Sequence, residues 1–238
     1  MKKFTLKHLL VTVVALCLFP DVWAEEKSSF EITPGADLVS SYIWRGVYQT
    51  GPAIQPSLAL SYAGLSLTAW GSTDFNFDAP GKEFDLSLGY SYKGLNLAVT
   101  DYWWSGEGAR YFKYKDSHYL EGTIGYYFGD KVPLTLTWNT MFGFNSDKKA
   151  NGDRYFSTYI EAGYDFSVKG VDMTASVGVT PWTGMYHKEG TDGFDVSSVS
   201  LKASKEIEVT DKFKLPLFVQ CIFSPNQDNV YLVVGTSF

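Results

Sequence analysis

The side chains that most often carry chemistry are scarce in this chain of 238 residues, which has three histidines and two cysteines. Ser117 and His118 are neighbours and could belong to a hydrolase site on the rim of a barrel, but the amide-bearing motif that such a site needs does not accompany them. His187 is far along the chain from His118, and two separated histidines do not make a metal site. We therefore expect no enzyme, no metal and no cofactor, and keep a rim hydrolase as a distant alternative.

Acidic side chains are more informative, because they alternate with apolar residues. In an extended strand, successive side chains point to opposite faces, so such a segment has one apolar and one polar face. By this alternation the polar face holds eight acidic and three basic residues. The acidic residues are Asp74, Glu83, Asp85, Glu121, Glu161, Asp165, Asp172 and Glu206, and the basic residues are Arg45, Lys202 and Lys214.

Two interpretations of this charged face stay open. The charges can be structural, held by water or by one another, because a buried charge needs a partner. Alternatively, they can line a pore that selects solutes by charge. We expect Arg45 to pair with Glu83 or Asp85. Three aromatic residues on the same face could stack on a sugar or nucleoside ring or could simply fill space; they are Trp70, Tyr102 and Trp104.

The alternating pattern predicts the elements that position these residues. Segments of about ten residues suit strands that cross a bilayer at a tilt, and an even number of strands is typical of bacterial barrels. The twelve expected strands are 36–48, 53–62, 65–75, 83–92, 95–104, 117–128, 134–144, 154–166, 171–182, 194–206, 213–223 and 229–238. We predict an all-β fold, a transmembrane antiparallel up-and-down β-barrel of about twelve strands.

Connections and aromatic residues support a membrane setting. From the second strand onward, short turns alternate with longer loops, as in outer-membrane barrels. Aromatic residues gather at both ends of the strands, where an interface with lipid headgroups would lie. The alternative is a soluble secreted barrel or sandwich in which the apolar residues point inward, and alternation alone does not separate the two.

The N-terminus predicts export. Residues 1–24 combine three lysines, an apolar run over 9–19 and a small-x-small site that ends at Ala24, which is typical of a cleaved signal peptide. Residues 25–238 would then form one barrel domain. The mature chain would keep 17 Lys and Arg against 25 Asp and Glu, a net charge of −8. Such a charge disfavours nucleic-acid binding, because phosphates attract basic surfaces.

The chain ends on Phe238, after an alternating segment. A terminal aromatic residue at this place resembles the signal that outer-membrane barrels present to the barrel-assembly machinery. We therefore expect that machinery and outer-membrane lipid as partners, and the Gram-negative outer membrane as the location.

A set of motifs in residues 35–92 resembles the TorF-type (Gcw_chp) family of porin-like proteins. The motifs are Ser40-Ser41-Tyr42-Ile43-Trp44-Arg45-Gly46, Pro52-Ala53-Ile54-Gln55-Pro56, Tyr62-Ala63-Gly64-Leu65 and Glu83-Phe84-Asp85. The resemblance implies an outer-membrane barrel and names no ligand.

Together these observations favour a narrow porin-like channel for the passive passage of small solutes. The excess of acidic residues predicts a preference for cations, since a charged, low-dielectric lumen concentrates counter-ions. The alternative is a non-conducting barrel whose external loops bind a ligand or partner. Barrels of about 8 strands are filled and those of about 16–18 are open, so a twelve-stranded barrel lies between the two cases.

Overall fold

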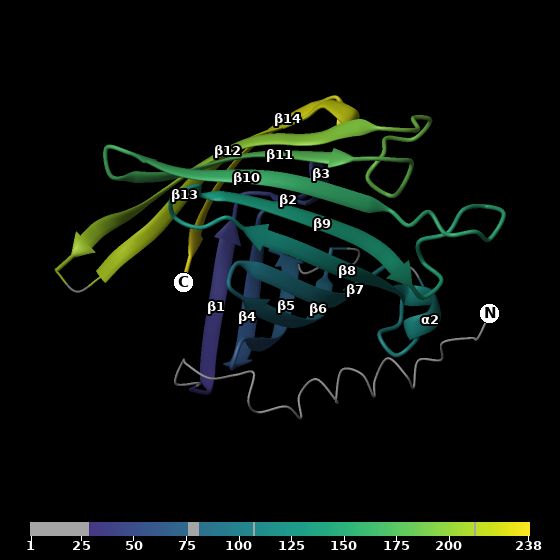
Figure 1. Ribbon diagram of the computed structural model, residues 1–238, viewed down its shortest axis with the longest axis horizontal. Coiled ribbons are helices and arrows are strands. Elements are labelled where there is room, and N and C mark those ends of the chain that lie inside the picture. Colours follow the sequence, from purple (N-terminus) through teal and green to yellow (C-terminus); the bar gives the residue numbers. More distant parts are fainter. Residues whose placement is uncertain (1–28, 76–80, 107, 212) are drawn as a thin grey trace.

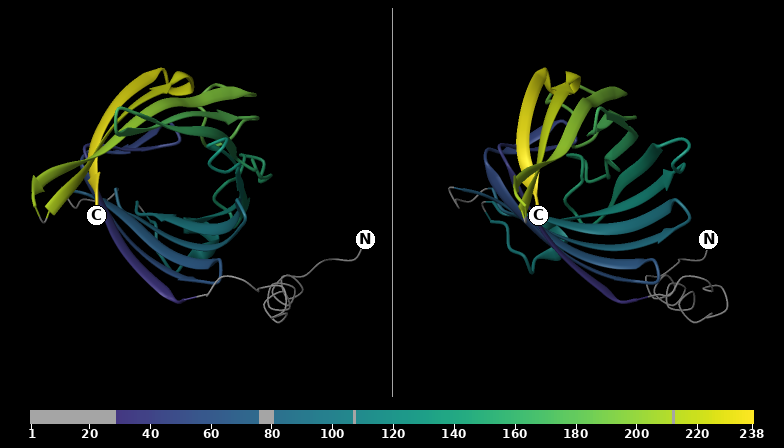
Figure 2. Two further views of the ribbon diagram at one scale, coloured as in Figure 1. Left: turned by 60° about the vertical axis from the view of Figure 1, so that its left-hand side comes forward. Right: turned by 90° about the vertical axis from the view of Figure 1, so that its left-hand side faces the viewer.

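The computed structural model describes residues 29–75, 81–106, 108–211 and 213–238. Within these residues, twelve antiparallel strands form one closed barrel (Figures 1 and 2). This confirms the predicted fold class. The signal peptide predicted for residues 1–24 lies outside the described residues.

Neighbouring barrel strands pair antiparallel around the ring, and the first strand closes on the last through residues 37–39 and 235–237. The barrel strands are β1 (Glu31–Val39), β4 (Ala53–Tyr62), β5 (Leu65–Asp74), β6 (Glu83–Tyr92), β7 (Leu95–Trp104), β8 (His118–Tyr127), β9 (Leu134–Gly143), β10 (Thr158–Val168), β11 (Val171–Thr180), β12 (Asp195–Thr210), β13 (Phe213–Ser224) and β14 (Asn229–Ser237). Most of these bounds agree with the prediction within a few residues.

The barrel has a polar interior and an apolar exterior. Leu88, Ile124 and Leu232 point outward and are 54%, 61% and 65% exposed. Glu83 and Glu121, in contrast, are only 5% and 1% exposed. A soluble barrel would show the opposite polarity, so that alternative is wrong, and this pattern is the one found in barrels surrounded by lipid.

The predicted first strand, 36–48, is wrong. β1 ends at Val39, and the following residues form a separate hairpin of β2 (Tyr42–Trp44) and β3 (Val47–Thr50). Its turn residues Arg45 and Gly46 have φ angles of 53° and 83°, which suit a two-residue hairpin turn. The alternation of apolar and polar residues continues through the hairpin, so the sequence pattern does not indicate this break.

The turn of this hairpin abuts the inner face of the barrel wall. A Cβ atom on Gly46 would lie 2.1 Å from the backbone oxygen of Ser197 in β12, so only glycine fits there. Ile43 of the hairpin also packs against a small buried cluster of Phe218, Ile222 and Val233. The hairpin is therefore an internal element of the barrel.

The two ends of the barrel differ. At the turn end, strands are joined by tight turns, of which Ala63-Gly64, Lys93-Gly94 and Lys169-Gly170 have positive φ at both residues. At the loop end lie the longer connections 105–117, 144–157 and 181–194, the first of which includes α2 (Tyr114–Ser117). A 3-10 turn, η2 (Pro225–Gln227), also lies at this end. Within the described residues, no helix is long and apolar enough to cross a membrane.

The hairpin of β12 and β13 extends beyond its neighbours at the turn end (Figure 1). β11 pairs with β12 only as far as Ser204, which leaves the rest of β12 without that neighbour. Lys214 on this extension lies 3.7 Å from Glu206 and 3.8 Å from Glu208. Lys214 and Glu206 are 55% and 66% exposed, so these two residues, expected in the lumen, lie outside its enclosed part.

Candidate functional site

An ion pair at the tip of the internal hairpin crosses the lumen. Arg45 reaches Glu121 of β8 with two parallel contacts, Nη1 to Oε2 at 2.5 Å and Nη2 to Oε1 at 2.8 Å. Side-chain exposure is 11% for Arg45 and 1% for Glu121. The expected pairing with Glu83 or Asp85 is therefore wrong, because the hairpin carries Arg45 across the lumen to another part of the wall.

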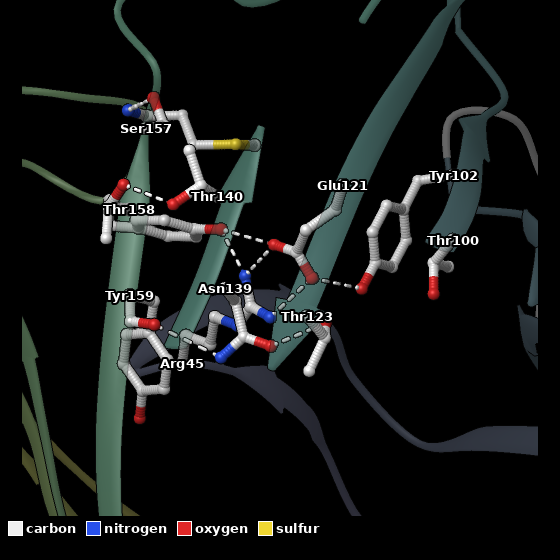
Figure 3. A network of polar contacts seen from close by, with 12 residues as sticks. Arg45, Thr100, Tyr102, Glu121, Thr123, Asn139, Thr140, Ser157, Thr158 and Tyr159 are labelled. Atoms are coloured by element: carbon white, nitrogen blue, oxygen red, sulfur yellow. Dashed lines mark hydrogen bonds and ion pairs between the residues drawn. The ribbon is translucent and has the colours of Figure 1, made fainter. Parts of the chain in front are cut away.

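Two tyrosines complete the bonds of this ion pair. Tyr102 of β7 donates to Oε1 of Glu121 at 3.0 Å, as Figure 3 shows, and the Tyr186 hydroxyl donates to Oε2 at 3.4 Å. The Tyr186 oxygen also accepts a hydrogen bond from Arg45. Burial raises the pKa of the Tyr186 hydroxyl above its usual range, so this group stays protonated and can donate. The carboxylate of Glu121 is thus well satisfied.

Aromatic rings surround the Arg45 guanidinium. Its central carbon lies 4.6 Å from the ring centroid of Trp44, 5.0 Å from that of Tyr159 and 5.3 Å from that of Tyr186. A cation over aromatic faces is attracted by the ring quadrupole, and more so when water is excluded. Arg45 is therefore held by both charge and ring contacts.

Tyr186 enters the lumen on the connection 181–194, which is tied to its surroundings. The backbone oxygen of Tyr186 accepts hydrogen bonds from Asn226 at 2.7 Å and from Gln227 at 3.0 Å. The backbone N–H of Met185 donates to the hydroxyl of the buried Ser157 at 2.8 Å. These bonds fix Tyr186 beside Arg45, and we call Trp44, Arg45, Glu121 and Tyr186 the septum.

The septum separates two cavities. The loop-end cavity has a volume of about 710 Å³ and is bounded by Trp44 and Tyr186. The turn-end cavity has a volume of about 570 Å³ and is bounded by Trp44 and Arg45. Because both cavities share Trp44, the septum forms the boundary between them.

A register shift in the pairing of β8 with β9 lies beside Glu121. Leu120 pairs with Gly143 while Glu121 pairs with Met141, so one residue of β9 is left over. Such bulges bend a strand locally and often occur next to functional sites. The bulge thus marks the place where Glu121 meets the septum.

Three of the acidic residues expected in the lumen lie on β10 and β11, from the turn-end cavity to the tight turn that joins these strands. Glu161 lines the turn-end cavity with Lys202, and it accepts a hydrogen bond from Tyr159 at 2.6 Å. Nearer the turns, Asp165 accepts from Thr174 at 2.6 Å, and Asp172 accepts from Ser167 at 2.7 Å. Their bonds come from hydroxyl groups, which leave the negative charges uncompensated.

Glu83 and Asp85 of β6 form a second acidic group. They are 5% and 7% exposed, and among the described residues neither makes a salt bridge. Glu83 has the Tyr42 hydroxyl and the Trp104 indole N–H as polar neighbours. One buried carboxylate oxygen each of Asp85 and Asp74 has no hydrogen-bond partner in the described part of the chain. This part of the wall therefore holds buried acidic groups without a cation beside them.

The predicted stacking residues separate into two places. Tyr102 and Trp104 stack with their ring centroids 5.5 Å apart and their planes 8° apart, and Trp44 contacts both rings. Trp70 packs instead on Tyr42, at 5.6 Å. Trp44 and Tyr186 also lie in the lumen, which the alternation of residue types does not predict, although the Trp-Arg-Gly sequence at 44–46 is a possible signal of a turn.

His118 is a structural residue on the outer face of the wall. It is fully buried, and its Nδ1 lies 2.8 Å from Asp101 while its Nε2 lies 2.5 Å from the backbone oxygen of Tyr111. Tyr114 stacks on the ring. Both ring nitrogens are engaged, so His118 anchors the connection 105–117. Asp101 of β7 also points to the outer face, and its contact with His118 explains how this acidic side chain is accommodated there.

His187 is also engaged within its own connection. Its Nδ1 accepts from the backbone of Gly184 at 3.1 Å, and its Nε2 lies 2.9 Å from the backbone oxygen of Gly193. In the described part of the chain, no group of three or more histidine, cysteine or acidic side chains is placed to hold a metal ion. The geometry therefore gives these histidines a structural role.

The fold and site define a twelve-stranded barrel with a polar interior divided by a septum. The sequence profile of the Gcw_chp family, described as bacterial protein of unknown function, matches residues 23–205. Since the match covers most of the chain, the protein belongs to the Gcw_chp family.

One solved structure similar to this chain is that of the COG4313 outer membrane channel from Pseudomonas putida F1. The two chains share 13% sequence identity, with 92% of this chain and 98% of the other covered and a TM-score of 0.39. No curated protein matches the chain.

Proposed function

We propose that the protein is an outer-membrane barrel that forms a narrow, passive, cation-preferring channel for small solutes, with the septum as its constriction. The apolar exterior supports a lipid setting, because exposing large apolar side chains to water around a whole barrel would be costly. The signal-like N-terminus supports export to that membrane.

The single observation that carries the proposal is the pair of cavities on opposite sides of the septum. Their volumes, about 710 and 570 Å³, are of the size that accommodates small molecules, roughly 300–1,000 Å³. The septum consists of side chains from the hairpin, β8 and the connection 181–194, while the rest of the lumen wall is polar. Passage would therefore be narrow and limited at this level.

Charge along the lumen supports the preference for cations. The Arg45–Glu121 pair is neutral overall, so the remaining acidic residues set the local potential. Glu161 lines the turn-end cavity together with Lys202, whose Nζ lies over the Phe218 ring at 4.2 Å, while Glu83 and Asp85 make no salt bridge among the described residues. A field of one sign inside low-dielectric walls raises the local concentration of ions of the other sign.

The C-terminus supports assembly in the outer membrane. Phe238 exchanges two backbone hydrogen bonds with Ala36, at 2.9 and 3.1 Å, and thereby closes the seam between β14 and β1. Its side chain is 58% exposed. We propose that the barrel-assembly machinery recognises this exposed terminal residue.

Liposome swelling tests the channel. Liposomes that hold the refolded protein should swell in isotonic glycerol, and Tyr186→Ala should swell faster because it removes a ring from the septum. Lys93→Ala, at a tight turn away from the septum, is the control and should behave like the unmodified protein. Swelling no faster than in protein-free liposomes, for all three proteins, would contradict a channel.

That negative result would favour the alternative, a non-conducting barrel whose loop end binds a ligand. The observation behind this alternative is the completeness of the septum bonds, since Glu121 accepts from Arg45, Tyr102 and Tyr186. A fully bonded septum is consistent with a permanent plug.

A further inference from the structure

We infer that the extension of β12 and β13 docks an extended, basic segment of a periplasmic protein, which adds to the open edge of β12 as a third strand. The inference rests on the proposed function in one respect, since the short turns of an outer-membrane barrel, and hence this extension, lie on the periplasmic side. Strand pairing itself requires only the extension. We call residues 205–209 of β12 the free edge.

The free edge has a neighbouring strand on one side only. β11 pairs with β12 no further than Ser204, whereas β13 continues along the other side. Figures 1 and 2 show the extension projecting beyond the wall. The unpaired N–H and C=O groups of such an edge form a template for another strand, and strand addition is a common mode of peptide recognition.

The opposite edge of the extension is less suitable for pairing. Residues 213–216 of β13 precede its pairing with β14, which begins at Leu217. Pro216 lies on this edge and has no N–H to donate. The free edge of β12 contains neither proline nor glycine. An incoming strand should therefore pair with β12.

The position of Pro216 also indicates which backbone groups are available. Pro216 pairs with Glu206. A proline is accommodated where the ladder needs no N–H, so the backbone groups of these two residues point away from each other. The N–H and C=O groups of Glu206 and, two residues on, of Glu208 therefore point to the free edge.

Lipid is a poor cover for the free edge. Backbone polar groups without partners are not tolerated in hydrocarbon, so the extension must lie outside the hydrocarbon layer, in contact with water. Its outward face is nevertheless apolar, because Ile207 pairs with Leu215 there, and Ile207 is 42% exposed. A two-stranded hairpin alone is marginally stable in water. A third strand would cover part of this face and add backbone bonds.

Charge on the other face defines the chemistry of the partner. Glu206 and Glu208 lie along the free edge and are 66% and 78% exposed. Lys214 contacts both, at 3.7 and 3.8 Å, from β13 and thus from the side away from the free edge. Unlike charges directly opposite each other stabilise a strand pair. The incoming strand should therefore place basic side chains opposite the glutamates and an apolar one opposite Ile207.

The same glutamates disfavour a second copy of this chain as the occupant. Two free edges can pair antiparallel about a two-fold axis with their faces matched. An axis at Ile207 brings Glu206 opposite Glu208, and an axis at either glutamate brings that residue opposite its own copy. Each of these registers sets two carboxylates against each other, which destabilises the pair. A different chain with basic residues is the better match.

Binding of a labelled peptide to the refolded full-length barrel in zwitterionic detergent tests the inference, with fluorescence anisotropy as the measurement. The probe is a short peptide in which lysine alternates with valine, and it should bind in a saturable manner. Glu208→Lys should weaken binding about tenfold, because an unlike pair becomes a like pair. Asp130→Lys is the matched control. It makes the same charge change at an exposed residue of another turn-end connection, so it should leave binding unchanged.

Two further peptides separate strand pairing from simple charge attraction. N-methylation of alternate backbone amides keeps the lysines but removes donors to the free edge, so this peptide should lose saturable binding. A peptide with glutamate in place of lysine should bind Glu208→Lys better than it binds the unmodified barrel.

Several results would overturn the inference. They are no saturable binding of the lysine peptide, equal binding of its N-methylated form, or equal losses in Glu208→Lys and Asp130→Lys. A barrel dimer in sedimentation that excludes the peptide would assign the free edge to a second copy. Loss of binding on transfer from detergent to phospholipid nanodiscs would assign it to lipid.

The proposed channel fails separately from this docking edge. Peptide binding without liposome swelling would remove the channel and keep the free edge as a docking surface. Swelling without peptide binding would do the reverse.

Discussion

Glu121 and the pair of Glu83 and Asp85 are buried carboxylates of one lumen wall, but they have opposite surroundings. Glu121 accepts two contacts from Arg45 and one hydrogen bond from each of two tyrosines. Glu83 and Asp85 make no salt bridge among the described residues. The difference arises from the hairpin of β2 and β3, which places the Arg45 guanidinium beside Glu121 of β8. In this barrel, the position of one internal turn decides which buried acid is neutralised.

The largest expected effect comes from removing the charge of Glu121. Glu121→Gln should lower the free energy of unfolding by about 3–5 kcal/mol, because it leaves the Arg45 charge buried without its partner. Glu83→Gln is the matched control and should cost much less, since no buried cation loses its partner when Glu83 is replaced. Urea unfolding of the refolded proteins, followed by tryptophan fluorescence, measures both. Equal losses in the free energy of unfolding for the two variants would contradict the difference between Glu121 and Glu83.

The next effect separates the lipid face from the lumen face. Leu136→Arg should cost about 2–4 kcal/mol because Leu136 faces outward on β9, toward the lipid. Thr137→Arg should cost less, since Thr137 lines the turn-end cavity and pairs there with the acidic Glu161. The same urea experiment in lipid bilayers compares them. A larger cost for Thr137→Arg would reverse the assignment of faces.

A smaller effect concerns ion selectivity. Replacing both Glu83→Gln and Asp85→Asn should weaken the preference for cations, and the change should be greatest at low salt, where screening is weak. The neutral septum pair should contribute little, so Arg45→Ala with Glu121→Ala should keep the preference. Reversal potentials in a salt gradient give the answer. A preference for anions in the unmodified protein would contradict the proposed role of the lumen charges.

The strands could be predicted from the sequence because lipid and lumen impose a strict two-residue alternation. The type of residue alone indicates its face. Leu86 and Leu136 face the lipid, whereas their neighbours Asp85 and Thr137 face the lumen. The internal hairpin could not be found in this way. Residues 42–50 keep the same alternation inside the lumen, where one face meets rings such as Trp104 and the other meets the wall.

The partner of Arg45 was not predictable for a related reason. Alternation assigns a side chain to a face, but it says nothing about distance across the lumen. Glu121 lies 76 positions from Arg45 and Tyr186 lies 141 positions from it, so their meeting depends on how the hairpin and the connection 181–194 fold inward. Trp44 and Tyr186 were missed for the same reason.

The most direct test of the account is the single-channel conductance of the Arg45→Ala, Glu121→Ala double variant in planar bilayers. Removing both partners avoids an unpaired buried charge, so the barrel should remain folded. We expect a small conductance for the unmodified protein and a clearly larger one for the double variant, while the conductance of Lys93→Ala stays at the original value. A folded double variant with unchanged conductance, or no conductance in any of the three proteins, would contradict the septum as the constriction of a channel.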